Sequence, residues 1–415
     1  MRLVVWCGVP RSGWVKPVSG ERLPDRVLIG VLTRVFPPEL VDSVLAEVGR
    51  VERRRRLLPA RLVVYYVLAM TLFSEASYEE VMRQLTEGLA WSSGWGDAWV
   101  VPSKAAIARA RQRLGVEPLE VLYGTVATPL ATEATRGAFF RGWRLMSIDG
   151  TCLDVADTPA NEAFFGRPGS SRRVGGGAFP QLRLVGLCES GTRAVVGAAL
   201  GPYTTSEQEL AAPLVAALWP GMLCLADRGF YGFERFNAAR ASGAELLWRA
   251  PLRLRVPRER ELPDGSFLAL LDVPRTLRSA PLAQRRVRVI EYQLGNAESG
   301  EATTYRLLTS ILDHEVAPAP ELAALYPQRW EIESALDELK THQRGPRVVL
   351  RSKSPDGALQ EAYGLLLTHY AIRRLMHDAA LAAGLDPDRL SFIRSLRAAR
   401  RSARASTGFS PHEPS

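Results

Sequence analysis

The sequence is poor in the residues that bind zinc or form disulfides. Its four cysteines contain no C-x-x-C pair and lie in apolar or mixed runs, which favours buried, reduced thiols over a disulfide framework. The five histidines are scattered along the chain without the spacing of metal ligands. The sequence therefore gives no support to a metal centre built on cysteine or histidine.

Long apolar runs are also missing. The longest, residues 62–73, is too short to span a bilayer and is typical of a buried helix. The apolar run at the N-terminus is too short for the core of a signal peptide. We therefore expect a cytosolic protein that is neither exported nor bound to a membrane.

Lysine is scarce as well, since only four of the 53 basic residues are lysines. The overall composition is that of an ordinary globular protein, since 47% of the 415 residues are hydrophobic and 23% are charged. A chain of this length and composition can bury a large core in two or three domains. The formal net charge of +9 favours a polyanionic partner without identifying one.

The first part of the chain has helical periodicity from about residue 28 to residue 131. Its last clear helix begins after Pro102 and Ser103 and stops at Gly115. Two basic clusters could contact DNA phosphates, or could equally be solvated surface. They are the run at residues 53–56 and the helix residues Lys104, Arg109, Arg111 and Arg113.

From residue 143 the pattern changes to strands, a hairpin around residues 189–191, and a helix ending at Gly243, which predicts an α/β domain with a mixed sheet. Prolines and short β-like segments follow, and the chain becomes helical again after Pro320. We expect a helical, DNA-binding N-terminal domain, an α/β core in two parts, a β-rich insertion between them, and a basic tail. Their boundaries are residues 1–140, 141–250, 251–305, 306–383 and 384–415.

Asp149 and Asp227 each follow an apolar run and precede a glycine within two positions, which predicts two carboxylates at the ends of buried strands. Taken singly, each is also compatible with an ordinary turn. A later helix carries Tyr326, Arg329, Glu333 and Lys340 within an arc of about 60°. Beside this stripe runs an apolar face formed by Ile332, Ala335, Leu336 and Leu339. A surface helix with ordinary salt bridges is the alternative.

Grouping Asp149, Asp227 and Glu333 would give an all-oxygen site. Such a site suits Mg²⁺, which prefers carboxylates and keeps several of its waters. Two such ions about 4 Å apart can activate an attacking oxygen and stabilise a leaving one in phosphodiester chemistry. The three residues are therefore candidate metal ligands and catalytic residues.

These motifs resemble those of the IS4 family of DDE transposases. The resemblance rests on Asp149 in SIDGT, Asp227 in LADRGFYG and the pattern Y-x2-R-x3-E-x6-K in YPQRWEIESALDELK. It extends to the N-terminal helices and to the spacing that leaves room for a β-rich insertion before Glu333.

The resemblance implies an RNase H-like catalytic core in which Asp149, Asp227 and Glu333 bind two Mg²⁺ ions, with Mn²⁺ as a substitute. It also implies that a second group of residues contacts DNA phosphates, and that Tyr305 stacks on a base flipped out during hairpin formation. That phosphate-binding group consists of Tyr326, Arg329, Lys340 and Arg228.

The function implied is cut-and-paste movement of an insertion sequence: metal-dependent cleavage and strand transfer at terminal inverted repeats in double-stranded DNA. The expected assembly is a homodimer in the synaptic complex, and the expected location is the bacterial cytoplasm, in association with the nucleoid. Two alternatives stay open. One is a metal-dependent nuclease that cleaves without joining, and the other is a non-catalytic DNA-binding protein derived from a transposase.

Overall fold

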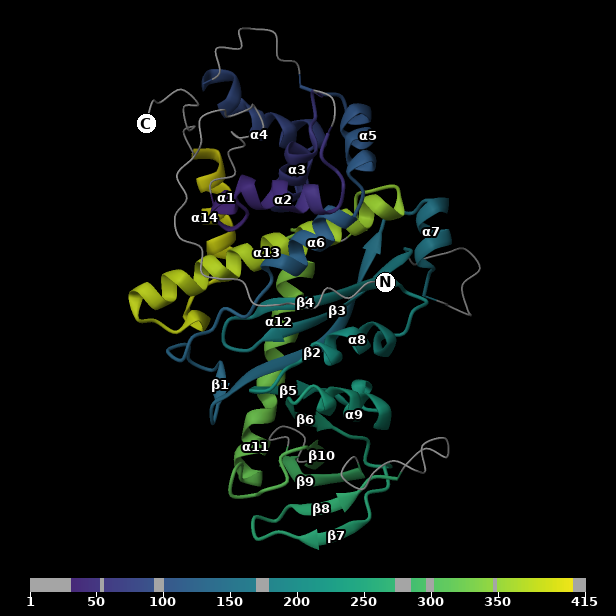
Figure 1. Cartoon of the computed structure of the whole chain (residues 1–415), viewed down its shortest axis with the longest axis vertical. Coiled ribbons are helices and arrows are strands. Elements are labelled where there is room, and N and C mark those ends of the chain that lie inside the picture. The colour runs from purple at the N-terminus through teal and green to yellow at the C-terminus, as the bar shows by residue number, and fades with distance from the viewer. Residues whose placement is uncertain are drawn as a thin grey trace.

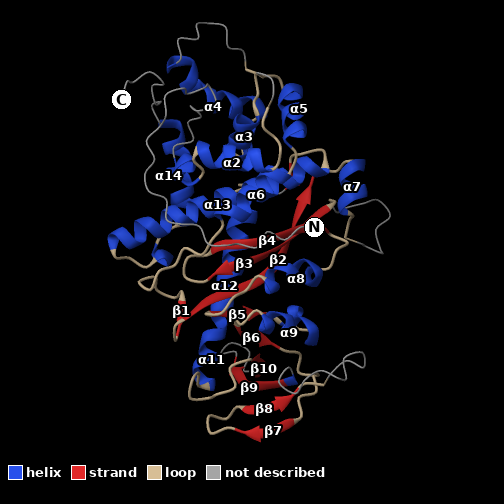
Figure 2. Ribbon diagram, viewed as in Figure 1, coloured by secondary structure: helices blue, strands red, loops and turns tan. Residues whose placement is uncertain are grey.

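The structure is a computed structural model that describes residues 31–52, 56–92, 101–168, 179–272, 285–295, 302–345 and 349–405. Helices gather at one end of an elongated molecule, and a single sheet runs from them to a strand-rich opposite end (Figures 1 and 2). Most of the arginine run at residues 53–56 and the end of the C-terminal tail lie outside the described residues.

The N-terminal region is helical, as predicted. Its helix α5 begins and ends where the sequence indicates, because the Ser103 side chain accepts a hydrogen bond from the Ala106 amide and Gly115 takes a φ of 73°. The helices are α1 (Val31–Val35), α2 (Pro38–Glu47), α3 (Ala60–Leu72), α4 (Tyr78–Ser92), α5 (Lys104–Leu114) and α6 (Glu117–Val126).

One mixed sheet of eleven strands is found in the described residues, in the order β4-β3-β2-β5-β6-β10-β9-β8-β7, with β1 and β11 paired to β2. β2, β5 and β6 are parallel to one another, whereas β3 and β4 are antiparallel additions beside β2. Three antiparallel strands followed by two parallel ones agree with the predicted α/β core. The strands are β1 (Phe139–Phe140), β2 (Trp143–Val155), β3 (Gln181–Glu189), β4 (Ala194–Pro202), β5 (Met222–Ala226), β6 (Glu245–Arg249), β7 (Arg258–Glu261), β8 (Phe267–Leu270), β9 (Arg286–Gly295), β10 (Ala302–Thr309) and β11 (Val349–Leu350).

Helices cover both faces of this sheet. On one face α8 (Glu207–Ala216) and α9 (Phe233–Ala241) pack on a core that includes Met146 and Ile148. On the other face α11 (Ala319–Leu325), α12 (Trp330–Asp337) and α13 (Pro355–Ala383) pack on alternate strand residues such as Leu145 and Leu184. Successive residues of β2 thus face different helices.

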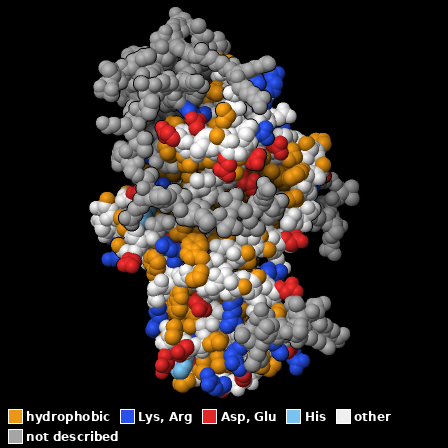
Figure 3. Space-filling view, in the orientation of Figure 1, with side chains coloured by type: hydrophobic (Ala, Val, Ile, Leu, Met, Phe, Trp, Pro, Cys, Tyr) orange, Lys and Arg blue, Asp and Glu red, His pale blue; other side chains and the backbone are white. Residues whose placement is uncertain are grey.

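The predicted β-rich insertion continues the same sheet, because β10 pairs with β6 as well as with β9. Several arginines of this segment are neutralised by acidic residues within it. Arg258 pairs with Glu261, Arg286 with Glu259, and the buried Arg288 with Asp264. Figure 3 accordingly shows basic and acidic side chains interspersed over the strand-rich end of the molecule.

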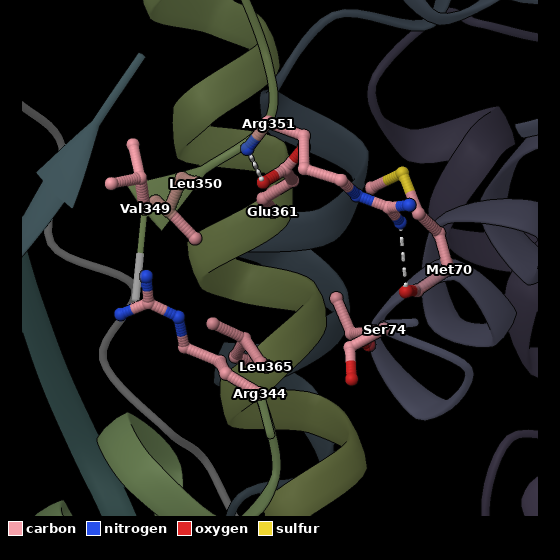
Figure 4. A pocket seen from close by; sticks show the side chains of 9 residues that line it. Met70, Ser74, Arg344, Val349, Leu350, Arg351, Glu361 and Leu365 are labelled. Atoms are coloured by element: carbon pink, nitrogen blue, oxygen red, sulfur yellow. Dashed lines mark hydrogen bonds between the residues drawn. The ribbon is translucent and has the colours of Figure 1, made fainter. Parts of the chain in front are cut away.

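The N-terminal helices share one hydrophobic core with α12, α13 and one side of β3 and β4. Arg351 ties α3 to the segment before α13, since its side chain donates to the carbonyl of Met70 and its amide donates to the Glu361 carboxylate (Figure 4). The remaining helices are α7 (Pro159–Phe165) and α14 (Phe392–Ala405). No helix in the described part of the chain has the length and apolar character needed to pass through a bilayer.

Arg111 belongs to this packing. Its guanidinium is buried and donates to the Gln360 side chain at 3.0 Å, the Ser352 hydroxyl at 3.0 Å and the Gly357 carbonyl at 2.8 Å. Arg109, on the same helix, is exposed.

We expect Arg111→Ala to lower the free energy of unfolding by roughly 2–4 kcal/mol, because three buried acceptors lose their donor. Arg109→Ala, the matched control, should change it by less than about 0.5 kcal/mol. Urea unfolding of both variants measures the difference. Equal stabilities would contradict a structural role for Arg111.

Candidate active site

Asp149 lies inside β2 rather than at its end, which corrects the predicted position at a strand terminus. β5 stops at Ala226, which is paired with Ile148, whereas β2 continues for seven residues beyond Ile148 because β3 and β11 still pair with it. Asp149 is therefore the first residue of β2 past the end of its parallel neighbour. Its partner Gly186 shares the face on which Ile332 and Leu336 of α12 pack.

Asp227 directly follows β5, as predicted, and precedes a short 3-10 turn, Arg228–Phe230. Because Ile148 and Ala226 are register partners on adjacent parallel strands, the backbones of Asp149 and Asp227 lie side by side, roughly one strand spacing of about 4.8 Å apart. The carboxyl end of a parallel strand is where open α/β sheets form their binding sites.

Glu333 comes from α12, whose apolar face packs on the sheet as predicted through Ile332, Ala335 and Leu336. The expected single helix is divided into a 3-10 turn at Tyr326–Arg329, α12 itself, and a π-helical turn at Glu338–His342. Lys340 lies exposed on that last turn.

Arg329 connects the carboxylates. Its guanidinium lies 3.3 Å from Asp149 Oδ2 and 2.7 Å from Glu333 Oε1. Only 7% of Arg329 is exposed, so these charges interact in a poorly solvated place where Coulombic attraction is strong. The structure therefore brings Asp149 and Glu333 to one cation, although they are far apart in the sequence.

Burial raises the pKa of Asp149 to about 6. A hydrogen bond from the Gly150 amide and the charge of Arg329 act in the opposite direction, whereas the negative charges of Glu207 and Glu333 raise the pKa further. Ionisation of this carboxylate is therefore unfavourable in the protein without a ligand. A bound cation would make it more favourable.

Tyr326 is buried, and its hydroxyl donates to the Ala226 carbonyl at 3.3 Å. It thereby packs α12 against the end of β5. Burial raises its pKa above the ordinary range. The contact between Tyr326 and the end of β5 helps to hold α12, and with it Glu333, near the two aspartates.

Arg249 ends β6 and lies beside Asp227, with 3.8 Å between its guanidinium nitrogen and Asp227 Oδ1. The guanidinium also stacks over the Tyr305 ring at 4.2 Å, and Tyr305 stacks on Tyr292 at 5.4 Å. Tyr305 is thus flanked by side chains from both neighbouring strands, β6 and β9, while Trp248 is a core residue.

The residues present fit a divalent metal ion. The donors are carboxylate oxygens, and Asp227 Oδ1 is a buried atom that receives no hydrogen bond from the described residues. Arg329 supplies the positive charge between Asp149 and Glu333. Among the described residues no three acidic or imidazole groups already enclose an ion-sized space, so a bound ion requires side-chain adjustment.

The remaining DNA-binding candidates differ in exposure. Arg228, Lys104, Arg109 and Arg113 are exposed, and Lys104 lies 3.6 Å from Glu79. Arg111, by contrast, is buried in the core and bonded there, which corrects its prediction as a DNA-binding residue.

Three further residues at this site were not predicted from the sequence. Trp330 is 59% exposed between Arg329 and Glu333, with its ring 5.2 Å from the Arg329 guanidinium. Its position inside the Tyr326–Lys340 motif was a signal that could have been used. Arg249, at the end of the next parallel strand, could have been found by the same strand-end argument as Asp227. The sequence around Glu207 has no motif that would indicate a place at this site.

Comparisons with known proteins bear on the family of this chain. Residues 26–124 match the family model for the insertion element 4 transposase N-terminal region, and residues 143–370 match that for the transposase DDE domain. The chain is 31% identical to transposase InsG for insertion sequence element IS4 of Escherichia coli K12, over 90% of this chain and 83% of that protein.

It is also 26% identical to the putative transposase InsZ of the same organism, over 52% of this chain and 69% of that one. A piggyBac transposase synaptic complex with hairpin DNA aligns with 94% of this chain and 83% of its own, at 12% identity and a TM-score of 0.48. The two family models and the extended match to InsG show that this chain belongs to the IS4 family of DDE transposases.

Proposed function

We propose that this transposase moves its element by cut-and-paste transposition, with Asp149, Asp227 and Glu333 as ligands of two Mg²⁺ ions. The supporting observation is the convergence of these carboxylates at the end of β5, from β2, from the turn after β5 and from α12. DDE domains generally use divalent metal ions, and an all-carboxylate donor set favours Mg²⁺, with Mn²⁺ as a substitute.

When bound, the ions would activate the attacking oxygen and stabilise the leaving oxygen at the scissile phosphodiester. The protein's own groups supply position and charge. Tyr326 and the apolar face of α12 hold Glu333 against the sheet. Arg329, which pairs with the Glu333 carboxylate, could exchange this partner for a phosphate of the DNA. Trp330 offers an exposed ring for a base or sugar beside the site.

Double-stranded DNA would reach this site across exposed basic residues on several elements. These are Arg228 and Lys340 near the carboxylates, Lys104, Arg109 and Arg113 on α5, and Arg394, Arg397 and Arg401 on α14. On α14, Phe392, Leu396 and Ala399 are buried, so the arginines spaced by three and four residues face solvent. Two terminal inverted repeats would be joined by a homodimer in the synaptic complex.

Replacing Asp149, Asp227 or Glu333 singly by alanine should abolish both cleavage and strand transfer, a loss of at least about 10³-fold, because each removes a ligand on which the chemistry depends. The assay is a labelled duplex carrying the element's ends with Mg²⁺ or Mn²⁺. Asp337→Ala removes an exposed carboxylate from the same helix and should retain activity.

Cleavage by the wild-type protein without joining would favour a nuclease. DNA binding without either step would favour a non-catalytic protein.

Metal binding should depend on pH because the pKa of Asp149 is raised to about 6. Since this value exceeds the ordinary one, the metal-free protein loses stability as pH rises from about 4 to about 6. A metal ion must displace the proton below about pH 6, so Mn²⁺ affinity should fall about fivefold between pH 6 and pH 5 and stay level above pH 7. Electron paramagnetic resonance of free Mn²⁺ measures this. Equal affinity at pH 5 and pH 8 would contradict the role of Asp149.

Phosphate contacts by α5 should appear in the salt dependence of DNA binding. Combining Lys104→Ala, Arg109→Ala and Arg113→Ala should reduce the slope of log K against log salt by up to about 2.7, because each phosphate contact contributes about 0.9. The control combines Arg109→Lys with Arg113→Lys, which keeps the charges and should keep the slope. An unchanged slope in the alanine variant would place the DNA elsewhere.

A further inference from the structure

Glu207 is a carboxylate close to the site that the DDE pattern does not include. It is the first residue of α8, and its helix end is satisfied without it. The Ser206 hydroxyl accepts from the Glu209 amide, and the Glu209 carboxylate accepts from the Ser206 amide and hydroxyl. The Glu207 side chain is therefore free of the capping role that usually explains an acidic residue in a first helical turn.

Glu207 reaches β2 at the residue after Asp149. A Cβ atom added to Gly150 would lie 1.9 Å from Glu207 Oε1, so the carboxylate occupies the space that any other side chain at residue 150 would fill. Gly150 is paired with Val185, which packs in the core on the α8 face. Glu207 thus approaches the end of β5 from one face of the sheet, while Glu333 approaches from the other.

Glu207 lies close enough to the two aspartates for their negative charges to interact. Burial raises its pKa, Arg183 lowers it, and Asp227 raises it again, while Glu207 in turn raises the pKa of Asp149. Among the described residues no hydrogen-bond donor lies within bonding distance of its carboxylate. The protein therefore holds a partly buried anion next to two others, an arrangement whose repulsion a divalent cation would relieve.

We propose that Glu207 is a fourth carboxylate of the metal site, which supplies an oxygen from the α8 side to an ion held by Asp149 and Asp227 at the end of β5. This inference rests on the proposed metal-dependent function. Four carboxylates would balance the charge of two divalent ions and leave Arg329 and Arg249 available to phosphates. Gly150 is then required because it lets the Glu207 carboxylate approach.

The test measures Mn²⁺ binding to the full chain at pH 8, by electron paramagnetic resonance or calorimetry. Glu207→Gln should weaken at least one Mn²⁺ site roughly 10- to 100-fold. The matched control is Glu234→Gln, an exposed glutamate in the first turn of the neighbouring helix α9, which should bind Mn²⁺ as the wild type does. Wild-type affinity in Glu207→Gln, together with loss of binding in Asp149→Ala, would overturn the role of Glu207 while the metal site stands.

Failure of the proposed function gives a different result, since Mn²⁺ would then bind wild type and Asp149→Ala equally. Thermal unfolding separates metal binding from a structural role. Without metal, Glu207→Gln should melt at the wild-type temperature or above it, because a repulsive charge is removed. The increase in melting temperature that Mn²⁺ causes should be smaller in Glu207→Gln than in the wild type. A lower melting temperature of Glu207→Gln without metal, together with a wild-type increase in melting temperature on adding Mn²⁺, would show a structural role instead.

Gly150→Ala provides an independent perturbation that keeps every charge. Its methyl group displaces the Glu207 carboxylate, so Mn²⁺ affinity should fall by a similar factor. Unchanged affinity in this variant would show that Glu207 does not bind the ion from its observed position.

Discussion

The structure depends on keeping several carboxylates together at a place where they repel one another. β5 ends at Ala226 while β2 continues, so the sheet itself sets Asp149 and Asp227 side by side. Helices then bring Glu333 from one face and Glu207 from the other. The buried guanidinium of Arg329 offsets part of this repulsion, because it pairs with both Asp149 and Glu333.

That arrangement requires a firmly held α12, and the neighbouring contacts provide it. Glu331 accepts from Arg193 of the β3–β4 hairpin, and Glu338 on the following π-helical turn is paired with the buried Arg373 of α13. Because α13 also packs on α3, the N-terminal helices and the carboxylate-bearing helix share one core. Displacing α13 would therefore move Glu333 as well as the N-terminal region.

Arginine has two distinct uses in this chain. Arg111, Arg288 and Arg373 are buried and donate to specific acceptors within the protein, which suits the planar, multidentate guanidinium. Within the described residues, the exposed arginines of α5 and α14 have no comparable set of buried acceptors, and they are the ones that we propose for phosphate contacts. Net charge alone therefore overstates the basic surface, above all in the β-rich insertion.

The sequence by itself determined the helical and β-rich segments, the caps of α5 and the family motif, because periodicity, capping and spacing are local properties. It also predicted Asp227 at a strand end and the apolar face beside Glu333. Only the tertiary structure placed Asp149 inside β2, buried Arg111, and brought Glu207 over Gly150. These depend on where a neighbouring strand stops and on which side chains from distant segments fill the same space, and no local pattern records either.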